Sequence, residues 1–144
     1  MNKQQLFAYV AHQYGITPDY PWTGAGSANA VLRHPSNGKW FALAMPVMAS
    51  KLGLSVQESV EIVLLKNEPL VVAHLREQVG IFSAYHMNKE HWISVLLESE
   101  SFDTQAIRNL KTVSDEQLAV LIDTSFSLTA PAKVSRKTKG KRQN

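Results

Sequence analysis

The sequence contains no cysteine. This absence excludes a disulfide scaffold, an iron–sulfur cluster, a zinc site with thiolate ligands and a cysteine nucleophile. Long hydrophobic runs are also missing, because no apolar stretch approaches the roughly 20 residues that cross a bilayer, and polar residues interrupt the N-terminal segment throughout. We therefore expect a soluble, cytoplasmic protein with no membrane partner.

Positive charge is scarce outside the C-terminus. The 144 residues hold 15 Lys and Arg against 12 Asp and Glu, a formal net charge of +3, yet residues 132–144 contain six of the cations and no acid. These six are Lys133, Arg136, Lys137, Lys139, Lys141 and Arg142. Without them, the first 131 residues carry a net charge of −3, from nine cations and 12 acids. The composition predicts one folded domain over residues 1–130 and a disordered basic tail over residues 131–144.

Hydrophobic periodicity predicts the order of helices and strands. Apolar residues at helical spacing predict a helix over residues 3–14, with Asn2 as its cap and Gln5 completing a capping box. From residue 30 the period changes to two, which predicts a hairpin over residues 30–49 and a third strand over residues 58–66. In the second strand of this hairpin, alternation places one set of side chains on the same face: Lys39, Phe41, Leu43, Met45 and Val47.

The second half of the chain predicts a helix, a hairpin and two further helices. Pro69 is expected to start the first helix and Gly80 to close it. FSAYHM and HWISVLLE predict the hairpin, with Asn88-Lys89-Glu90 near its turn. Asp103 and Ser114 are expected to cap the last two helices. The order α-β-β-β-α-β-β-α-α predicts an α+β fold with a five-stranded antiparallel sheet and helices packed on one face.

Few residues suggest catalysis. Gly24-Ala25-Gly26 lacks the strand, helix and third glycine of a dinucleotide-binding loop, and the acids Glu98, Glu100 and Asp103 fit a solvated connection. The histidines His34, His86 and His91 have no diagnostic ligand spacing, so hydrogen-bonded histidines are the simpler interpretation than a metal site. A Ser–His–Asp triad stays open, because its members meet only in space. We expect no enzyme activity, no metal ion and no cofactor.

Basic and aromatic residues alternate near the predicted strand ends, in Lys39-Trp40-Phe41, at Lys66 and over residues 85–92. Such positions can offer cations to phosphates and rings to bases. On composition alone, core aromatics with a solvated rim of lysines are the simpler interpretation.

At these residues the chain resembles the MmcQ/YjbR family. The shared landmarks run in the family's order over about residues 3–128: YGITPDYPW, AVLRHPSNGKWFAL, VEIVLLKNEP, LREQVGIFSAYHMNKEHWISVLLE and LIDTSFSL. The resemblance implies an α-β(3)-α-β(2)-α fold of the secretion-chaperone-like kind and a DNA-binding function through paired β-hairpin wings. The candidate contacts that it implies are Arg33, Lys39, Lys66, His86, Asn88, Lys89, His91 and Trp92.

Two functional hypotheses follow. In the first, the protein binds DNA through these wing residues, and the tail adds affinity by counterion release. The −3 charge of the domain means that the contacts must be concentrated on a few strand-end residues or lie in the tail. In the second, the sheet face binds a protein or a small acidic ligand without catalysis, Trp40, Tyr85, His86 and Trp92 line the site, and Lys66 or Lys89 pairs with an acidic group.

Overall fold

A computed structural model describes residues 1–99 and 104–132 of the chain. The basic residues predicted to form the tail, Lys133 onward, lie outside the described residues, as do Glu100 and Asp103. The elements, in chain order, are α1 (Lys3–Tyr14), the 3₁₀ turn η1 (Gly24–Gly26), β1 (Ala30–Arg33), β2 (Trp40–Met48), the 3₁₀ turn η2 (Ala49–Leu52), β3 (Ser59–Lys66), α2 (Pro69–Leu75), β4 (Ile81–Ser83), β5 (Trp92–Leu96), α3 (Gln105–Arg108) and α4 (Asp115–Thr129).

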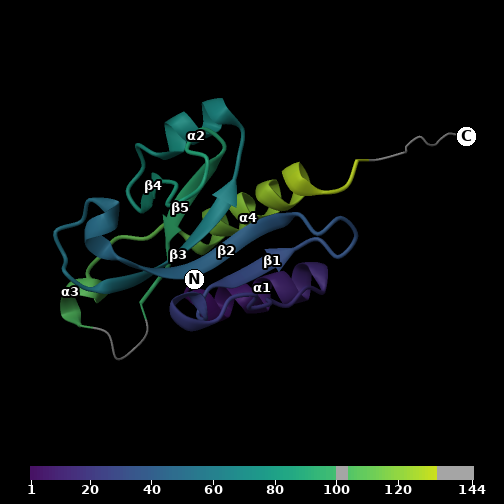
Figure 1. Cartoon of the computed structure of the whole chain (residues 1–144). Helices are drawn as coiled ribbons and strands as arrows, with labels where there is room; N and C mark the ends of the chain where they lie inside the picture. The colour runs from purple at the N-terminus through teal and green to yellow at the C-terminus, as the bar shows by residue number, and fades with distance from the viewer. Residues whose placement is uncertain (100–103, 133–144) are drawn as a thin grey trace, which may run out of the picture.

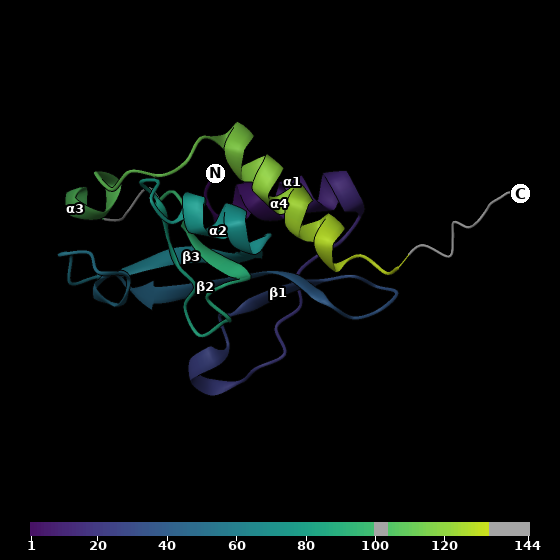
Figure 2. The same ribbon diagram turned by 90° about the horizontal axis from the view of Figure 1, so that it is seen from above.

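The five strands form one antiparallel sheet in the order β1-β2-β3-β5-β4 (Figure 1). Figure 2 shows α1, α2 and α4 on the same side of this sheet. The predicted α+β fold and element order are confirmed. Among the described residues, no helix is both long and apolar enough to cross a membrane.

Two hydrophobic clusters cover the two faces of the sheet. The first lies between the sheet and the helices, where Leu6 of α1 and Ile122 of α4 pack against strand residues such as Val63 and Ile93. The second lies on the opposite face, where buried strand residues are flanked by half-buried side chains from loops and strand ends. Because both faces carry apolar residues, the central strand β3 is buried along most of its length.

Local capping chemistry sets the ends of the long helices. The side chain of Asn2 accepts a hydrogen bond from the Gln5 amide, and the Gln5 side chain accepts one from the Asn2 amide, which is the predicted capping box. The Ser114 side chain caps α4 by accepting from the Gln117 amide, while the Gln117 side chain bonds to that of Gln78. The cap of α3 is Thr104, whereas the predicted cap, Asp103, lies outside the described residues.

The prediction that all alternate residues of β2 share a face is wrong at Phe41. Leu32 pairs with Ala42 but Arg33 pairs with Trp40, so Phe41 is the extra residue of a β-bulge. The bulge shifts the alternation by one residue. Phe41 therefore packs in the helix-side cluster, edge-on to Phe126 with ring centres 5.0 Å apart, while Trp40 packs in the cluster on the opposite face.

The predicted helix from Pro69 to Gly80 is too long. α2 ends at Leu75, and the following amides form tighter bonds, including Glu77 N–H to the His74 carbonyl. Gly80, at φ +93°, turns the chain toward β4 and lies so close to the Lys111–Val113 backbone that a side chain would crowd it.

Candidate nucleic-acid interface at one end of the sheet

The strand-end cations that the sequence singled out come from different strands but lie at one end of the sheet. Arg33, the last residue of β1, pairs with Trp40, the first of β2, and Lys66, the last of β3, pairs with Trp92, the first of β5. Lys39 precedes β2, and the β4–β5 loop supplies the rest. We call this set the basic end; it comprises Arg33, Lys39, Lys66, His86, Lys89 and His91.

Helix α4 is tied to this end by a buried hydroxyl. Ser125 is fully buried, and its Oγ donates to the Phe41 carbonyl at 2.6 Å and accepts from the Lys66 amide at 2.9 Å. The last registered pair of β2 and β3 is Ala42 with Leu65, so the hydroxyl sits just beyond it, between the two strand ends. Ser125 thereby fixes the backbone that carries Lys66.

The last turn of α4 contacts the β1–β2 hairpin. The Oγ1 of Thr129 lies 2.9 Å from Nε2 of His34, and the Asn37 side-chain amide donates to the Thr129 carbonyl at 3.2 Å. Figure 1 shows the end of α4 and the β1–β2 turn on the same side of the molecule. The last turn of α4, which precedes the basic residues of the C-terminus in the sequence, therefore lies at the basic end.

His34 is a core histidine at this junction. It is 3% exposed, and its ring lies 4.3 Å from that of Phe126 and 5.2 Å from that of Phe41. Burial lowers the pKa of His34, and a backbone hydrogen bond at Phe126 opposes this only in part. Within residues 1–99 and 104–132, no group of three His, Asp or Glu residues is placed to hold a metal ion.

Two of the cations at the basic end have local partners. Arg33 forms an ion pair with Asp19, with Nε to Oδ2 at 3.0 Å and Nη2 to Oδ1 at 3.1 Å, which neutralises much of its field. The Lys89 ammonium donates to the Ala84 carbonyl at 2.7 Å across the base of the β4–β5 loop. A neutral carbonyl leaves the charge of Lys89 in place, so Lys39, Lys66 and Lys89 carry most of the positive charge here.

Asn88, a predicted DNA contact, is used to build the loop. Its Oδ1 accepts from the Glu90 amide at 2.8 Å and the His91 amide at 3.2 Å, and its carbonyl accepts from the Trp92 amide at 3.0 Å. These bonds form an Asx-type turn. Asn88 thus shapes the approach to β5, and the structure gives its side-chain oxygen no free role in binding.

His86 adopts a left-handed backbone, with φ at +62°, the one non-glycine residue of the described chain with a positive φ. Its exposed ring lies over that of Tyr85, with centres 3.9 Å apart and planes at 43°. Trp40 and Trp92 differ from it, because both are half-buried against the second cluster and Trp22 packs edge-on against Trp40 at 5.6 Å.

Sequence reasoning missed the residues that join α4 to the sheet. Ser125 and Thr129 are buried polar residues four positions apart on the apolar stripe of α4, which is a spacing that the sequence displays. Arg76 was also missed. Its Nη1 donates to the Lys89 carbonyl at 3.5 Å, which adds a cation beside the β4–β5 loop.

Comparisons with known proteins identify the family and the fold. The YjbR family model matches residues 11–128. The chain is 38% identical over 129 residues to the uncharacterized protein YyaQ of Bacillus subtilis, covering 90% of this chain and 98% of that protein. It is 40% identical to a Pseudomonas syringae protein whose crystal structure matches with a TM-score of 0.79, covering 90% of this chain and all of the other. A Deinococcus radiodurans protein, at 21% identity and a TM-score of 0.59, shares the fold over 88% of this chain and 77% of its own. The chain belongs to the YjbR family.

Proposed function

We propose that this chain binds DNA, without catalysis, through the basic end of the sheet and the basic tail. The observation that carries the proposal is convergence. The β1–β2 hairpin, the end of β3 and the β4–β5 loop bring Lys39, Lys66 and Lys89 to one end of the sheet, and the last turn of α4, which precedes the basic C-terminal residues, lies at the same end. A DNA partner agrees with the cytoplasmic location expected from the sequence.

The acids of the domain divide between the two ends of the sheet: Asp19, which pairs with Arg33, Glu68, two residues after Lys66, and Glu90, next to Lys89, lie at the basic end. Glu58 and Glu61 lie at the other end of β3, and Glu98 follows the far end of β5. Lys3 lies 3.7 Å from Glu61, so this carboxylate already has a cationic partner. At the basic end four Lys and Arg stand against Asp19, Glu68 and Glu90, a formal charge of +1, whereas the first 131 residues as a whole carry −3.

A salt titration of duplex binding tests the proposal. Each neutralised phosphate contributes about 0.9 to the slope of log K against log salt. Replacing Lys39 and Lys66 together by Gln should lower this slope by about two. Replacing the six tail cations by Gln should lower it by roughly five. Fluorescence anisotropy with a labelled duplex measures both effects.

The matched control is the double variant Lys51→Gln and Lys111→Gln, which removes the same charge from exposed positions away from the basic end. Its slope should equal that of the unaltered chain. Absence of duplex binding by the unaltered chain at low salt would refute the proposal. If only the tail variant loses affinity, the basic end plays no part, and DNA binding belongs to the tail alone.

A further inference from the structure

The ends of four neighbouring strands place cations and aromatic rings alternately across the sheet. The strand order β1-β2-β3-β5 brings the end residues side by side, and two of the contacts are direct register pairs, Arg33 with Trp40 and Lys66 with Trp92. Residues directly opposite each other in an antiparallel pair point to the same face of a sheet. We call this set the end row; in strand order it comprises Arg33, Trp40, Lys66 and Trp92.

The end row lies on the face of the sheet that points away from the helices. Trp40 and Trp92 both pack in the second hydrophobic cluster, and both are half-buried, so part of each indole reaches the surface. Figure 2 shows α1, α2 and α4 on the other side of the sheet. Neighbouring strands are about 4.8 Å apart, so the backbones that carry the two indoles are roughly 10 Å apart, with Lys66 on the strand between them.

Further rings lie next to those of the end row. Trp22 is 37% exposed and packs edge-on against Trp40, with ring centres 5.6 Å apart. The hydroxyl of buried Ser94 accepts from the Tyr85 amide at 3.0 Å, which holds Tyr85 beside β5 with the exposed ring of His86 over it. His86 has a φ of +62°, a backbone conformation that is rare for this residue type and that clusters at binding sites.

We propose that the end row and these neighbouring rings bind single-stranded DNA, with unpaired bases stacked on the rings and phosphates beside Lys66. The inference rests on the proposed function and adds the form of DNA that the site takes. Every base has an aromatic face, so stacking on protein rings binds a single strand without regard to its sequence. In a duplex the bases are already stacked and paired with one another, and their faces do not reach a sheet surface.

The weak charge of the basic end favours the same conclusion. Its Lys, Arg, Asp and Glu residues sum to a formal charge of +1, so phosphate contacts alone supply little attraction. Stacking of bases on aromatic side chains does not depend on net charge and adds to the affinity for each base that is bound. Rings that alternate with cations therefore suit a ligand in which bases alternate with phosphates.

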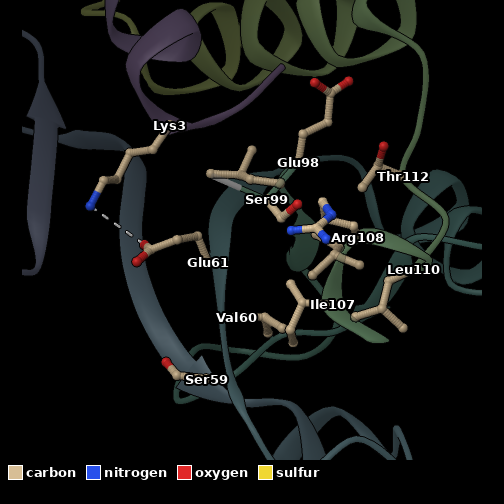
Figure 3. Close-up of a pocket in the computed structure, with 12 residues that line it drawn as sticks. Lys3, Ser59, Val60, Glu61, Glu98, Ser99, Ile107, Arg108, Leu110 and Thr112 are labelled. Carbon is tan, nitrogen blue, oxygen red and sulfur yellow. Dashed lines mark ion pairs between the residues drawn. The ribbon is translucent and has the colours of Figure 1, made fainter. Parts of the chain in front are cut away.

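A pocket at the other end of the sheet lacks this combination of rings and cations. It has a volume of about 600 Å³ and lies where β3 begins and β5 ends (Figure 3). The charged side chains that line it balance: Lys3, Arg108, Glu61 and Glu98. Because β3 has eight residues at about 3.3 Å each, its first residue, which lines the pocket, lies roughly 23 Å from Lys66. Backbone amides at the pocket therefore serve as an internal reference for binding at the end row.

The test compares three ligands of about 12 nucleotides at low salt with the full chain: single-stranded oligothymidylate, a strand of equal length that lacks bases, and a duplex. Oligothymidylate should bind at least about tenfold more tightly than the strand without bases, since one stacked base contributes about five- to 150-fold. All three tryptophans of the chain lie on this surface, so oligothymidylate should quench their fluorescence. The strand without bases and the duplex should not.

Trp92→Leu removes one ring and keeps an apolar side chain. It should reduce the preference for oligothymidylate over the strand without bases by about fivefold or more, and leave affinity for the latter within about twofold. Trp22→Leu, at an exposed ring, should weaken the preference in the same direction with little change in the core. The matched control is Phe7→Leu, which removes a half-buried ring on the helix side of the sheet and should change the preference less than about twofold.

Backbone amide NMR locates the bound strand, and the shifts should centre on Lys66 and Trp92. The inference is overturned if the two single strands bind equally, if fluorescence is not quenched, if both tryptophan variants keep the full preference, or if the shifts centre on Val60 and Ile107 at the pocket. Each of these results leaves the proposed DNA binding standing. Absence of binding to all three ligands would overturn both proposals.

Discussion

Replacing Ser125 by Ala tests how the fold holds the basic end. The hydroxyl of Ser125 is the partner of two backbone groups, the Phe41 carbonyl at 2.6 Å and the Lys66 amide at 2.9 Å, and it is fully buried. Alanine differs from serine by a single oxygen, so little packing is lost. The cost comes instead from two buried polar groups that lose their partner, at about 1–3 kcal/mol each.

The expected loss in the free energy of unfolding is therefore about 2–6 kcal/mol, out of the roughly 5–15 kcal/mol typical of a domain. Urea unfolding should show the midpoint falling by about 1–3 M with an unchanged slope, since m is about 2 kcal/mol/M for domains of this size. Hydrogen exchange adds a local measurement, because the Lys66 amide should lose its protection while the amides at the middle of β3 keep theirs.

Ser127→Ala is the control, because Ser127 is exposed on the same helix, two residues away. Its stability should stay within about 0.5 kcal/mol of the unaltered chain. A loss below about 1 kcal/mol in Ser125→Ala, with the Lys66 amide still protected, would refute the reasoning. It would mean that β2 and β3 close and pair directly once the hydroxyl is gone.

Three further predictions concern strain and titration. His86→Gly should raise the free energy of unfolding, measured in urea, by about 0.5–1 kcal/mol. The reason is that relief of the left-handed backbone, about 1–2 kcal/mol, exceeds the entropy cost of glycine, about 0.5–1 kcal/mol. His86→Ala, which keeps the Cβ, should give no such gain. Burial lowers the pKa of His34 in the folded state, so the contribution of His34 to stability should be constant above pH 6.5, the ordinary pKa of a histidine in the unfolded chain. Below pH 6.5 the free energy of unfolding should fall by up to about 1.4 kcal/mol per pH unit. In His34→Gln this acid-side slope should shrink, and an unchanged slope would exclude His34 as its source. Burial, aided by hydrogen bonds to Asp123, raises the pKa of Tyr9 to about 12 and raises that of Tyr14 as well. The free energy of unfolding should therefore hold up to pH 10 and fall above it. Phenolate absorbance should show two tyrosines that ionise only at high pH, and Asp123→Asn should make both ionise at lower pH.

Local signals made most of the fold predictable from the sequence. The capping box of Asn2 and Gln5 and the cap at Ser114 depend on residues within one turn, and the structure confirms both. The end of α2 could not be predicted in this way. Val79 continues the helical spacing but is 68% exposed, because the chain must turn at Gly80 to bring β4 beside β5.

The bulge at Phe41 shows why the face of a side chain can be lost even where the strand is predicted correctly. Alternation alone assigns Phe41 to the face of Leu43, whereas the register shift turns it toward the rings of Tyr14 and Phe126. One extra residue in a strand reverses the assignment of everything beyond it. That is why Trp40 ends up on the face opposite to Phe41.

For the candidate site, the sequence located the cations but not their partners. Strand ends meet in an antiparallel sheet, so Lys39 and Lys66 could be expected near one another once the strands were known. The Asp19–Arg33 pair and the Lys89 bond to Ala84 depend on how two irregular loops fold back, which no period in the sequence records. Arg33 and Lys89 have these partners, so their predicted roles in binding change most.

The acidic domain and the proposed DNA contact are compatible because charge acts over a limited distance. At physiological salt the Debye length is about 8 Å, whereas the two ends of β3 lie roughly 23 Å apart. A phosphate at the basic end would therefore sense Lys39, Lys66 and Lys89 together with the neighbouring Glu68 and Glu90. It would be screened from Glu58 and Glu61 at the other end of the strand. Net charge is thus a poor guide to the partner of this domain. The acids at the far end of β3 lie beyond the range over which their charge is felt at the basic end, so the binding of an anion there depends on the balance of Lys39, Lys66 and Lys89 against Glu68 and Glu90 alone.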